Sequence, residues 1–229
     1  MSRLIAVGCS HKVGEGLPDK PEIPPPSTSM YAWPVHLGKK LNLPVKNIAQ
    51  GGISNKQICK LILDEQLFQS DIVVFMWTYF ARTCFFENEK TSKRVTVSET
   101  KRSLRDPKKF FRKIPTNQQT DSTYSKKFYK TYFSHYNAVW ESYQNINFAK
   151  YYLDSMGIKN VHTTCEIVPY LGINDNGEEQ KFPAPEWNIV NLEEINLYRK
   201  SNSNLHSDAN AHEKMSVDIL SYIDREYKL

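Results

Sequence analysis

The segment Asp71–Trp77 (DIVVFMW) is a continuous apolar run that follows a polar turn. A run without alternation of polar and apolar residues is typical of a strand that is buried on both faces. Such strands occur where helices cover both sides of a parallel sheet. The run therefore predicts a central strand in an α/β protein.

Shorter strands and amphipathic helices alternate along the rest of the chain. The apolar patterns predict strands over Leu4–Gly8, Val45–Ala49 and Val161–Val168, and helices over Tyr31–Leu41, Asn55–Phe68, Tyr132–Met156 and His212–Tyr227. Strands and helices that alternate in this way form a parallel sheet with helices on both faces. We therefore expect a three-layer α/β/α domain whose central parallel sheet has about five strands in the flavodoxin-like order 2-1-3-4-5.

Two of the predicted helices carry end signals. Ser54 is a favourable N-cap for the helix over Asn55–Phe68, and Gly157 is placed to end the helix over Tyr132–Met156. In that long helix, the spacing puts six apolar residues near the buried side: Val139, Trp140, Tyr143, Ile146, Phe148 and Leu153.

The length of 229 residues suits one large domain, and we expect a single domain over 1–229 with a basic insertion at about 83–131. From Arg82 to Lys130 the chain has 14 Lys and Arg against 5 Asp and Glu, whereas the rest has 16 against 20. Pro107 and Pro115 predict an irregular, largely exposed segment. A solvated surface is the favoured interpretation of this charge. A lid for an anionic or glycan substrate and a contact with nucleic acid are the alternatives.

The four cysteines, at positions 9, 59, 84 and 165, form no CxxC pair, and we expect free and mostly buried thiols. No apolar run approaches the roughly 18 residues of a membrane span. The N-terminal segment also lacks the charged-then-apolar pattern of a signal peptide. We therefore expect a cytoplasmic protein with no membrane partner.

A serine and a histidine stand near opposite ends of the chain, where a parallel fold can bring them together. Ser10 follows the first strand on the turn Gly8-Cys9-Ser10, and His206 precedes the last helix. Open α/β sheets carry their chemistry at the carboxyl ends of the strands. A histidine can take the proton of a serine hydroxyl, and backbone N–H groups of Ser10 and Gly52 can bind the oxyanion of an ester. This arrangement predicts acyl transfer.

Four short blocks stand at strand ends or before the last helix: Gly8-Cys9-Ser10 with Gly14 and Gly16, Asn47 to Gly52 with Ser54-Asn55, Trp77-Thr78 with Arg82, and Leu205-His206-Ser207. In type and order, these blocks resemble the SGNH hydrolases, also called GDSL-like esterases. The Gly-Cys-Ser form is similar to a branch common in marine phages and bacteria. The resemblance implies a serine nucleophile at Ser10, an oxyanion hole from Ser10, Gly52 and Thr78, and a phage-like protein made in a host cytoplasm.

The chain departs from the family pattern at two positions. Thr78 stands where the family has an asparagine, and its hydroxyl is shorter than an amide, so the oxyanion hole is weaker or differently shaped. Ser203 stands where the family has an aspartate, and it carries no charge to stabilise an imidazolium. A Ser10–His206 dyad with a main-chain carbonyl orienting the ring is the preferred solution. Asp208 is the alternative third member.

Three further residues are candidate substrate-binding residues: His11, Trp77 and Arg82. His11 is expected at the surface or in the binding site. Cys9 is not expected to be the nucleophile, because it neighbours a buried strand. His206 and His212 with Asp208 have no established metal-ligand spacing, so we expect no metal and no cofactor, and we expect His212 to pack behind the site.

Three hypotheses for function follow. The leading one is a serine hydrolase that cleaves an acyl or acetyl ester in a small molecule or a glycan. An acyltransferase on the same scaffold is the second. The third is a catalytically silent binding module that has lost the family's aspartate and asparagine and recognises a ligand or nucleic acid through its basic insertion.

Overall fold

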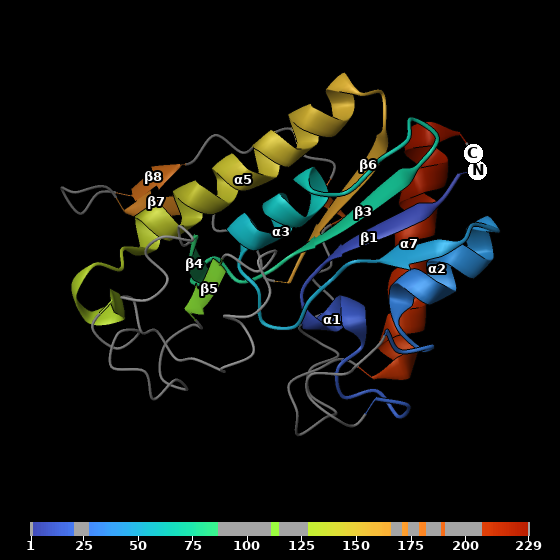
Figure 1. The fold of residues 1–229 in the computed structure, drawn as a ribbon, viewed down its shortest axis with the longest axis horizontal. Coiled ribbons are helices and arrows are strands. Elements are labelled where there is room, and N and C mark those ends of the chain that lie inside the picture. The colour runs from blue at the N-terminus through green and yellow to red at the C-terminus, as the bar shows by residue number, and fades with distance from the viewer. Residues whose placement is uncertain are drawn as a thin grey trace.

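A five-stranded parallel sheet forms the centre of the protein (Figure 1). The computed structural model describes residues 2–20, 28–86, 111–114, 128–165, 171–173, 179–181, 189–190 and 208–228. The strands of the sheet are β1 (Leu4–Gly8), β2 (Val45–Asn47), β3 (Ile72–Trp77), β6 (Lys159–Thr164) and β9 (Ile189–Val190). They lie in the order β2-β1-β3-β6-β9, and every neighbouring pair is parallel. The predicted strand order is therefore confirmed.

Helices cover both faces of this sheet, which confirms the predicted three layers (Figure 1). The helices of one face are α2 (Trp33–Leu41) and α7 (Ala209–Tyr227), and those of the other are α3 (Asn55–Leu63) and α5 (His135–Ser155). All six residues of β3 are buried. Ile72, Val74 and Met76 pack toward α2 and α7. Val73, Phe75 and Trp77 alternate with them and pack toward α3 and α5.

The structure differs from the predictions in the end of α3 and in the residues that α5 buries. Ser54 caps α3 as expected, with Gln57 completing a capping box, but α3 ends at Leu63. Trp140 and Phe148 are 43% and 55% exposed, so their predicted burial was wrong. The buried stripe of α5 runs through Val139, Tyr143, Ile146, Ala149 and Leu153. Trp140 and Phe148 each lie one position away from this stripe, which turns them about 100° around the helix.

Two small antiparallel ladders lie outside the main sheet. β4 (Thr83–Phe86) pairs with β5 (Phe111–Ile114), and β7 (Leu171–Ile173) pairs with β8 (Glu179–Lys181). The ladder of β4 and β5 is regular structure at the start and in the middle of the segment 83–131, which was predicted to be irregular. Residues 87–110 and 115–127 of the predicted basic insertion lie outside the described residues. Within the described part of the chain, no helix is both long enough and apolar enough to cross a membrane.

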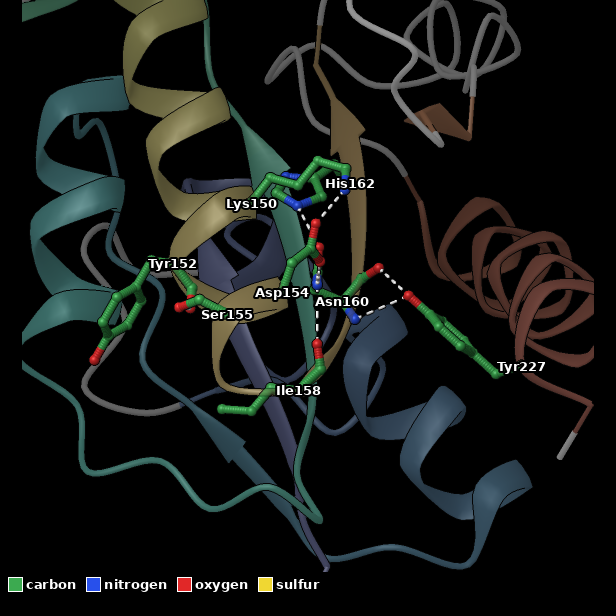
Figure 2. A network of polar contacts seen from close by, with 8 residues as sticks. All are labelled: Lys150, Tyr152, Asp154, Ser155, Ile158, Asn160, His162 and Tyr227. Carbon is green, nitrogen blue, oxygen red and sulfur yellow. Dashed lines mark hydrogen bonds and ion pairs between the residues drawn. The ribbon is translucent and has the colours of Figure 1, made fainter.

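A buried polar network around His162 ties β6 to α5 and α7 (Figure 2). The Nδ1 atom of His162 accepts a hydrogen bond from Trp77 Nε1 at 3.0 Å. Its Nε2 donates to Asn160 Oδ1 at 2.9 Å, and Asn160 in turn donates to Asp154. Burial, followed by the charges of Lys150 and Lys12, lowers the pKa of His162 to about 3. A protonated ring would also direct a second N–H at the Trp77 N–H, so the folded protein holds this histidine neutral.

The neutral histidine predicts a pH-dependent stability. Unfolded His162 gains a proton near its ordinary pKa of about 6.5, whereas the folded protein does not gain it until about pH 3. The unfolded state therefore binds more protons in this window, and the free energy of unfolding should fall by about 1.4 kcal/mol per pH unit below pH 6.5. Urea denaturation at pH 7 and pH 5 measures this slope. His162→Gln should flatten it and His36→Gln should retain it; an unchanged slope in His162→Gln would contradict the assignment.

Candidate active site

The carboxyl ends of β1, β2 and β3 bring the three predicted oxyanion residues to one edge of the sheet. β1 ends at Gly8, and β3 ends immediately before Thr78. The backbone N–H of Gln50 donates to the Gly8 carbonyl at 3.0 Å, which extends the pairing of β1 beyond the end of β2. The turn that contains Gly52 therefore starts beside Gly8, and Gly8 is two residues before Ser10 in the sequence. The expectation that Ser10, Gly52 and Thr78 share this edge is confirmed.

Ser10 is the first residue of a four-residue helix, α1 (Ser10–Val13), and is 5% exposed. Its carbonyl accepts from the N–H groups of Gly14 and Glu15 at 2.9 and 3.3 Å, which closes the turn behind it. Gly14 has a φ of 82°, and a Cβ there would lie 2.6 Å from the Ser29 Cβ. Both facts require glycine at this position. The loop after the first strand is thus closed by hydrogen bonds to the Ser10 carbonyl and by close packing of Gly14 against Ser29.

Gly52 ends the second turn with a φ of 63°. Such a dihedral is ordinary for glycine and rare for other residues. Two residues later, Ser54 caps α3 and is 1% exposed, so the turn is anchored shortly after Gly52. The role of the Gly52 N–H as an oxyanion donor stays a prediction.

Asn55 clamps the backbone of Thr78 from both sides. The Thr78 N–H donates to Asn55 Oδ1 at 2.8 Å, and Asn55 Nδ2 donates to the Thr78 carbonyl at 3.1 Å. The same Nδ2 donates to Ser142 Oγ on α5 at 3.0 Å. Asn55 is 2% exposed, so this clamp is part of the interior. Sequence analysis used Asn55 only as a family match and did not assign this role, because the contact joins residues 23 positions apart.

Arg82 connects Thr78 to a neighbouring cavity. Its Nη1 donates to Thr78 Oγ1 at 2.8 Å, and its guanidinium lies 4.8 Å from the centre of the Tyr79 ring. Because Thr78 Oγ1 accepts from Arg82, the hydroxyl keeps its own proton for donation. Arg82 also lines a cavity of about 110 Å³, whose other walls include Phe80, Phe133, Asn137, Glu141 and Asn145. The predicted position of Arg82 in the site region is supported by this geometry, and its substrate contact stays a prediction.

Lys12 is a fully buried lysine beside the site, and sequence analysis missed it. Its Nζ donates to the Val74 carbonyl and lies 4.6 Å from the centre of the Trp33 ring. Burial lowers the pKa of Lys12 well below its usual range, while the neighbouring Cys9 and Cys165 act in the opposite direction. Nothing in the local sequence distinguishes this lysine from an exposed one, because its burial depends on the packing of α2 against the sheet.

The C-terminal candidates are only partly described. His206 and Ser203 lie outside the described residues, so their roles stay predictions. Asp208 is the N-cap of α7, and its Oδ1 accepts from the Ala211 N–H at 2.8 Å. His212 is 0% exposed, and its Nδ1 accepts from the Trp33 N–H at 3.1 Å, which confirms its predicted packing at the start of the helix.

Two of the candidate binding residues are buried. Trp77 is 0% exposed, stacks on Phe75 with the ring centres 5.0 Å apart, and donates to His162. Its side chain is therefore part of the core under α3 and α5, which does not fit the predicted substrate contact. His11 is 3% exposed because α1 turns the chain inward after Ser10, so the surface position is wrong and the binding alternative stays a prediction. All four cysteines are free and buried, as predicted.

Comparisons with known proteins give similarity at the level of the overall arrangement. No protein-family model matches the chain, and a comparison with curated proteins gives no match. A protein assigned to the lipolytic G-D-S-L family from Desulfitobacterium hafniense has a TM-score of 0.49 at 11% identity, over 96% of this chain and 98% of that one. An acetyl xylan esterase from the rumen bacterium Butyrivibrio proteoclasticus has a TM-score of 0.47 at 13% identity, over 99% of this chain and 64% of that one.

A third solved structure, of a carbohydrate esterase, has a TM-score of 0.45 at 12% identity, over 98% of this chain and 65% of that one. This chain thus spans just under two thirds of the length of the two esterases. Because all three TM-scores are below 0.5, the assignment of chemistry to this chain depends on its own residues.

Proposed function

We propose that this chain is an SGNH-type serine hydrolase, of the Gly-Cys-Ser phage-like branch, that cleaves an acyl or acetyl ester on a carbohydrate. The observation that carries the proposal is the convergence of Ser10, Gly52 and Thr78 at one sheet edge, with Thr78 held by Asn55 and Arg82. A serine at a strand end needs donors at fixed positions to stabilise an oxyanion. The clamp on Thr78 provides this rigidity.

In the proposed reaction, the Ser10 hydroxyl attacks the ester carbonyl and His206 takes its proton. The N–H groups of Ser10 and Gly52 and the Thr78 hydroxyl stabilise the oxyanion. The proton then passes from His206 to the leaving alcohol, and water hydrolyses the acyl-serine with His206 as the base. Because Asp208 Oδ1 is engaged in capping α7, we favour a dyad in which a main-chain carbonyl orients the His206 ring.

A small cavity beside Arg82 borders the candidate site without Ser10, Gly52 or Thr78 in its walls, and it supports a polar group in the substrate. Its volume of about 110 Å³ is well below that of a pocket for a whole drug-sized ligand, roughly 300 Å³ or more. Its walls combine the aromatic rings of Phe80 and Phe133 with the polar side chains of Asn137, Glu141 and Asn145. Such a mixture suits a sugar ring in the alcohol part of the ester, which is why we propose a carbohydrate ester.

Covalent labelling tests the proposal directly. A fluorophosphonate should add to the reduced full-length protein, and peptide mapping should find the adduct on Ser10. The protein should hydrolyse p-nitrophenyl acetate faster than the octanoate ester and release acetate from acetylated xylo-oligosaccharides. Absence of both the adduct and any ester hydrolysis would contradict the proposal in favour of a binding module. Transfer of the acyl group to an added sugar with little free acid formed would indicate an acyltransferase.

A further inference from the structure

The thiols of Cys9 and Cys165 are in contact although they are 156 positions apart in the chain. Their Sγ atoms lie 3.2 Å apart, and one thiol donates a hydrogen bond to the other. Cys9 follows β1 and Cys165 follows β6, two strands that both flank β3. The exposed fractions of the two residues are 1% and 2%. Backbone contacts hold this end of the sheet in place, since the Cys165 N–H donates to the Trp77 carbonyl at 2.9 Å.

The environment of this pair differs from that of the other two cysteines. The hydrogen bond from Cys165, followed by the charge of Arg82 and a hydrogen bond from the His11 backbone, lowers the pKa of the Cys9 thiol against the effect of burial. Burial instead raises the pKa of Cys59, to about 11, and that of Cys84. A thiolate is the reactive form of cysteine. Of the four cysteines, Cys9 therefore has the greatest tendency to form a thiolate, and the Cys165 sulfur lies 3.2 Å from it.

We propose that Cys9 and Cys165 are an oxidation site, at which a hydroperoxide converts the two thiols into a reversible intramolecular disulfide next to Ser10. The Sγ atoms need to close from 3.2 Å to about 2.05 Å, a movement of roughly 1 Å. Side-chain rotation and a small shift of the two strand ends can supply a movement of this size.

The reaction is balanced with a hydroperoxide as the oxidant. The Cys9 thiolate attacks one peroxide oxygen, the O–O bond breaks, and Cys9 becomes a sulfenic acid while a hydroxide or alkoxide leaves. Cys165 then attacks the Cys9 sulfur, so that an S–S bond forms and the S–O bond breaks. The departing hydroxide accepts the proton of the Cys165 thiol and becomes water. Two thiols and one hydrogen peroxide thus give one disulfide and two waters, and a dithiol reductant reverses the change.

Oxidation would also act on the residue next to the candidate nucleophile. Cys9 immediately precedes Ser10 in the sequence. Formation of the disulfide would draw the Cys9 side chain toward Cys165, at the end of β6. An effect on turnover rests on the proposed function, whereas the disulfide itself does not.

Thiol counting with peptide mapping tests the site on the full-length protein. The reduced protein should take up four alkyl groups after denaturation. After treatment with hydrogen peroxide, the protein should take up two alkyl groups, and its mass before alkylation should be lower by about 2 Da. The digest should contain a disulfide-linked Cys9–Cys165 peptide. Dithiothreitol should restore the uptake of four alkyl groups. Four thiols after peroxide treatment, a pairing through Cys59 or Cys84, or a disulfide-linked dimer would overturn the proposal.

Matched variants separate this pair from general thiol oxidation. Cys59→Ala should still lose two thiols, because it leaves the pair intact. Cys165→Ser should form no intramolecular disulfide after peroxide treatment. Cys9 should instead remain as a sulfenic acid or a higher oxide, which the added mass of oxygen reveals. The mapping of the wild-type protein decides the question even where a variant fails to fold. The mapping requires no turnover. If the reduced protein hydrolyses no ester but forms the Cys9–Cys165 disulfide after peroxide treatment, the proposed hydrolase is refuted and the proposed oxidation site is retained.

Discussion

Ser10→Ala is expected to abolish ester hydrolysis, with kcat falling by about 10⁴-fold or more, because no other group would form the acyl intermediate. The same variant should retain nearly all of its stability. Ser10 is small, and alanine fills almost the same space at the first position of α1, so the change in the free energy of unfolding should be about 1 kcal/mol. Initial rates on p-nitrophenyl acetate and urea denaturation measure the two effects.

Ser216→Ala is a matched control for the loss of a buried hydroxyl. Ser216 is 0% exposed on α7, and its Oγ donates to the Glu213 carbonyl at 2.6 Å, away from the candidate site. This variant should keep the wild-type rate. His206→Ala should match the loss in Ser10→Ala, and the double variant should lose little more, since the two residues act as one unit. Unchanged turnover in Ser10→Ala would refute the mechanism.

The fold was predictable because its signals are local. The buried run that became β3 and the cap at Ser54 are each contained within a few residues, and together with the alternation of strands and helices they led to the correct sheet order. The helix α1 was not predicted, since four residues in a proline-rich and glycine-rich loop carry too little periodicity. The burial of Trp140 and Phe148 was mispredicted for a related reason. Both are apolar, but the narrower stripe through Ala149 faces the sheet.

The contacts of the candidate site were less predictable, because most of them join distant segments. The ends of β1 and β3 could be placed at one edge from strand order alone. The burial of Lys12 depends on Trp33 and Val74, and the clamp of Asn55 on Thr78 depends on α3 lying beside the end of β3. The contact of Cys9 with Cys165 likewise needs β1 and β6 to flank the same strand. Short-range patterns contain none of this information.

Thr78→Val should lower kcat by about 10² to 10³-fold, which is the usual cost of removing one side-chain donor from an oxyanion hole. Valine has nearly the shape of threonine but has no hydroxyl. The donor acts on charge that develops only in the transition state, so KM should change little. Thr78→Ser keeps the hydroxyl that accepts from Arg82 and should retain most of the activity. Steady-state kinetics on a short acyl ester measure both parameters.

Thr163→Val provides the control for this substitution. Thr163 is 0% exposed on β6, and its hydroxyl donates to the Phe75 carbonyl at 2.7 Å, so its loss should cost about 1 kcal/mol of stability. It should not lower kcat, because this hydroxyl is already engaged within the sheet. A similar loss of kcat in Thr163→Val and Thr78→Val would show that the effect comes from disturbed packing. A wild-type kcat in Thr78→Val would remove Thr78 from the oxyanion hole and leave the backbone N–H groups of Ser10 and Gly52 as its donors.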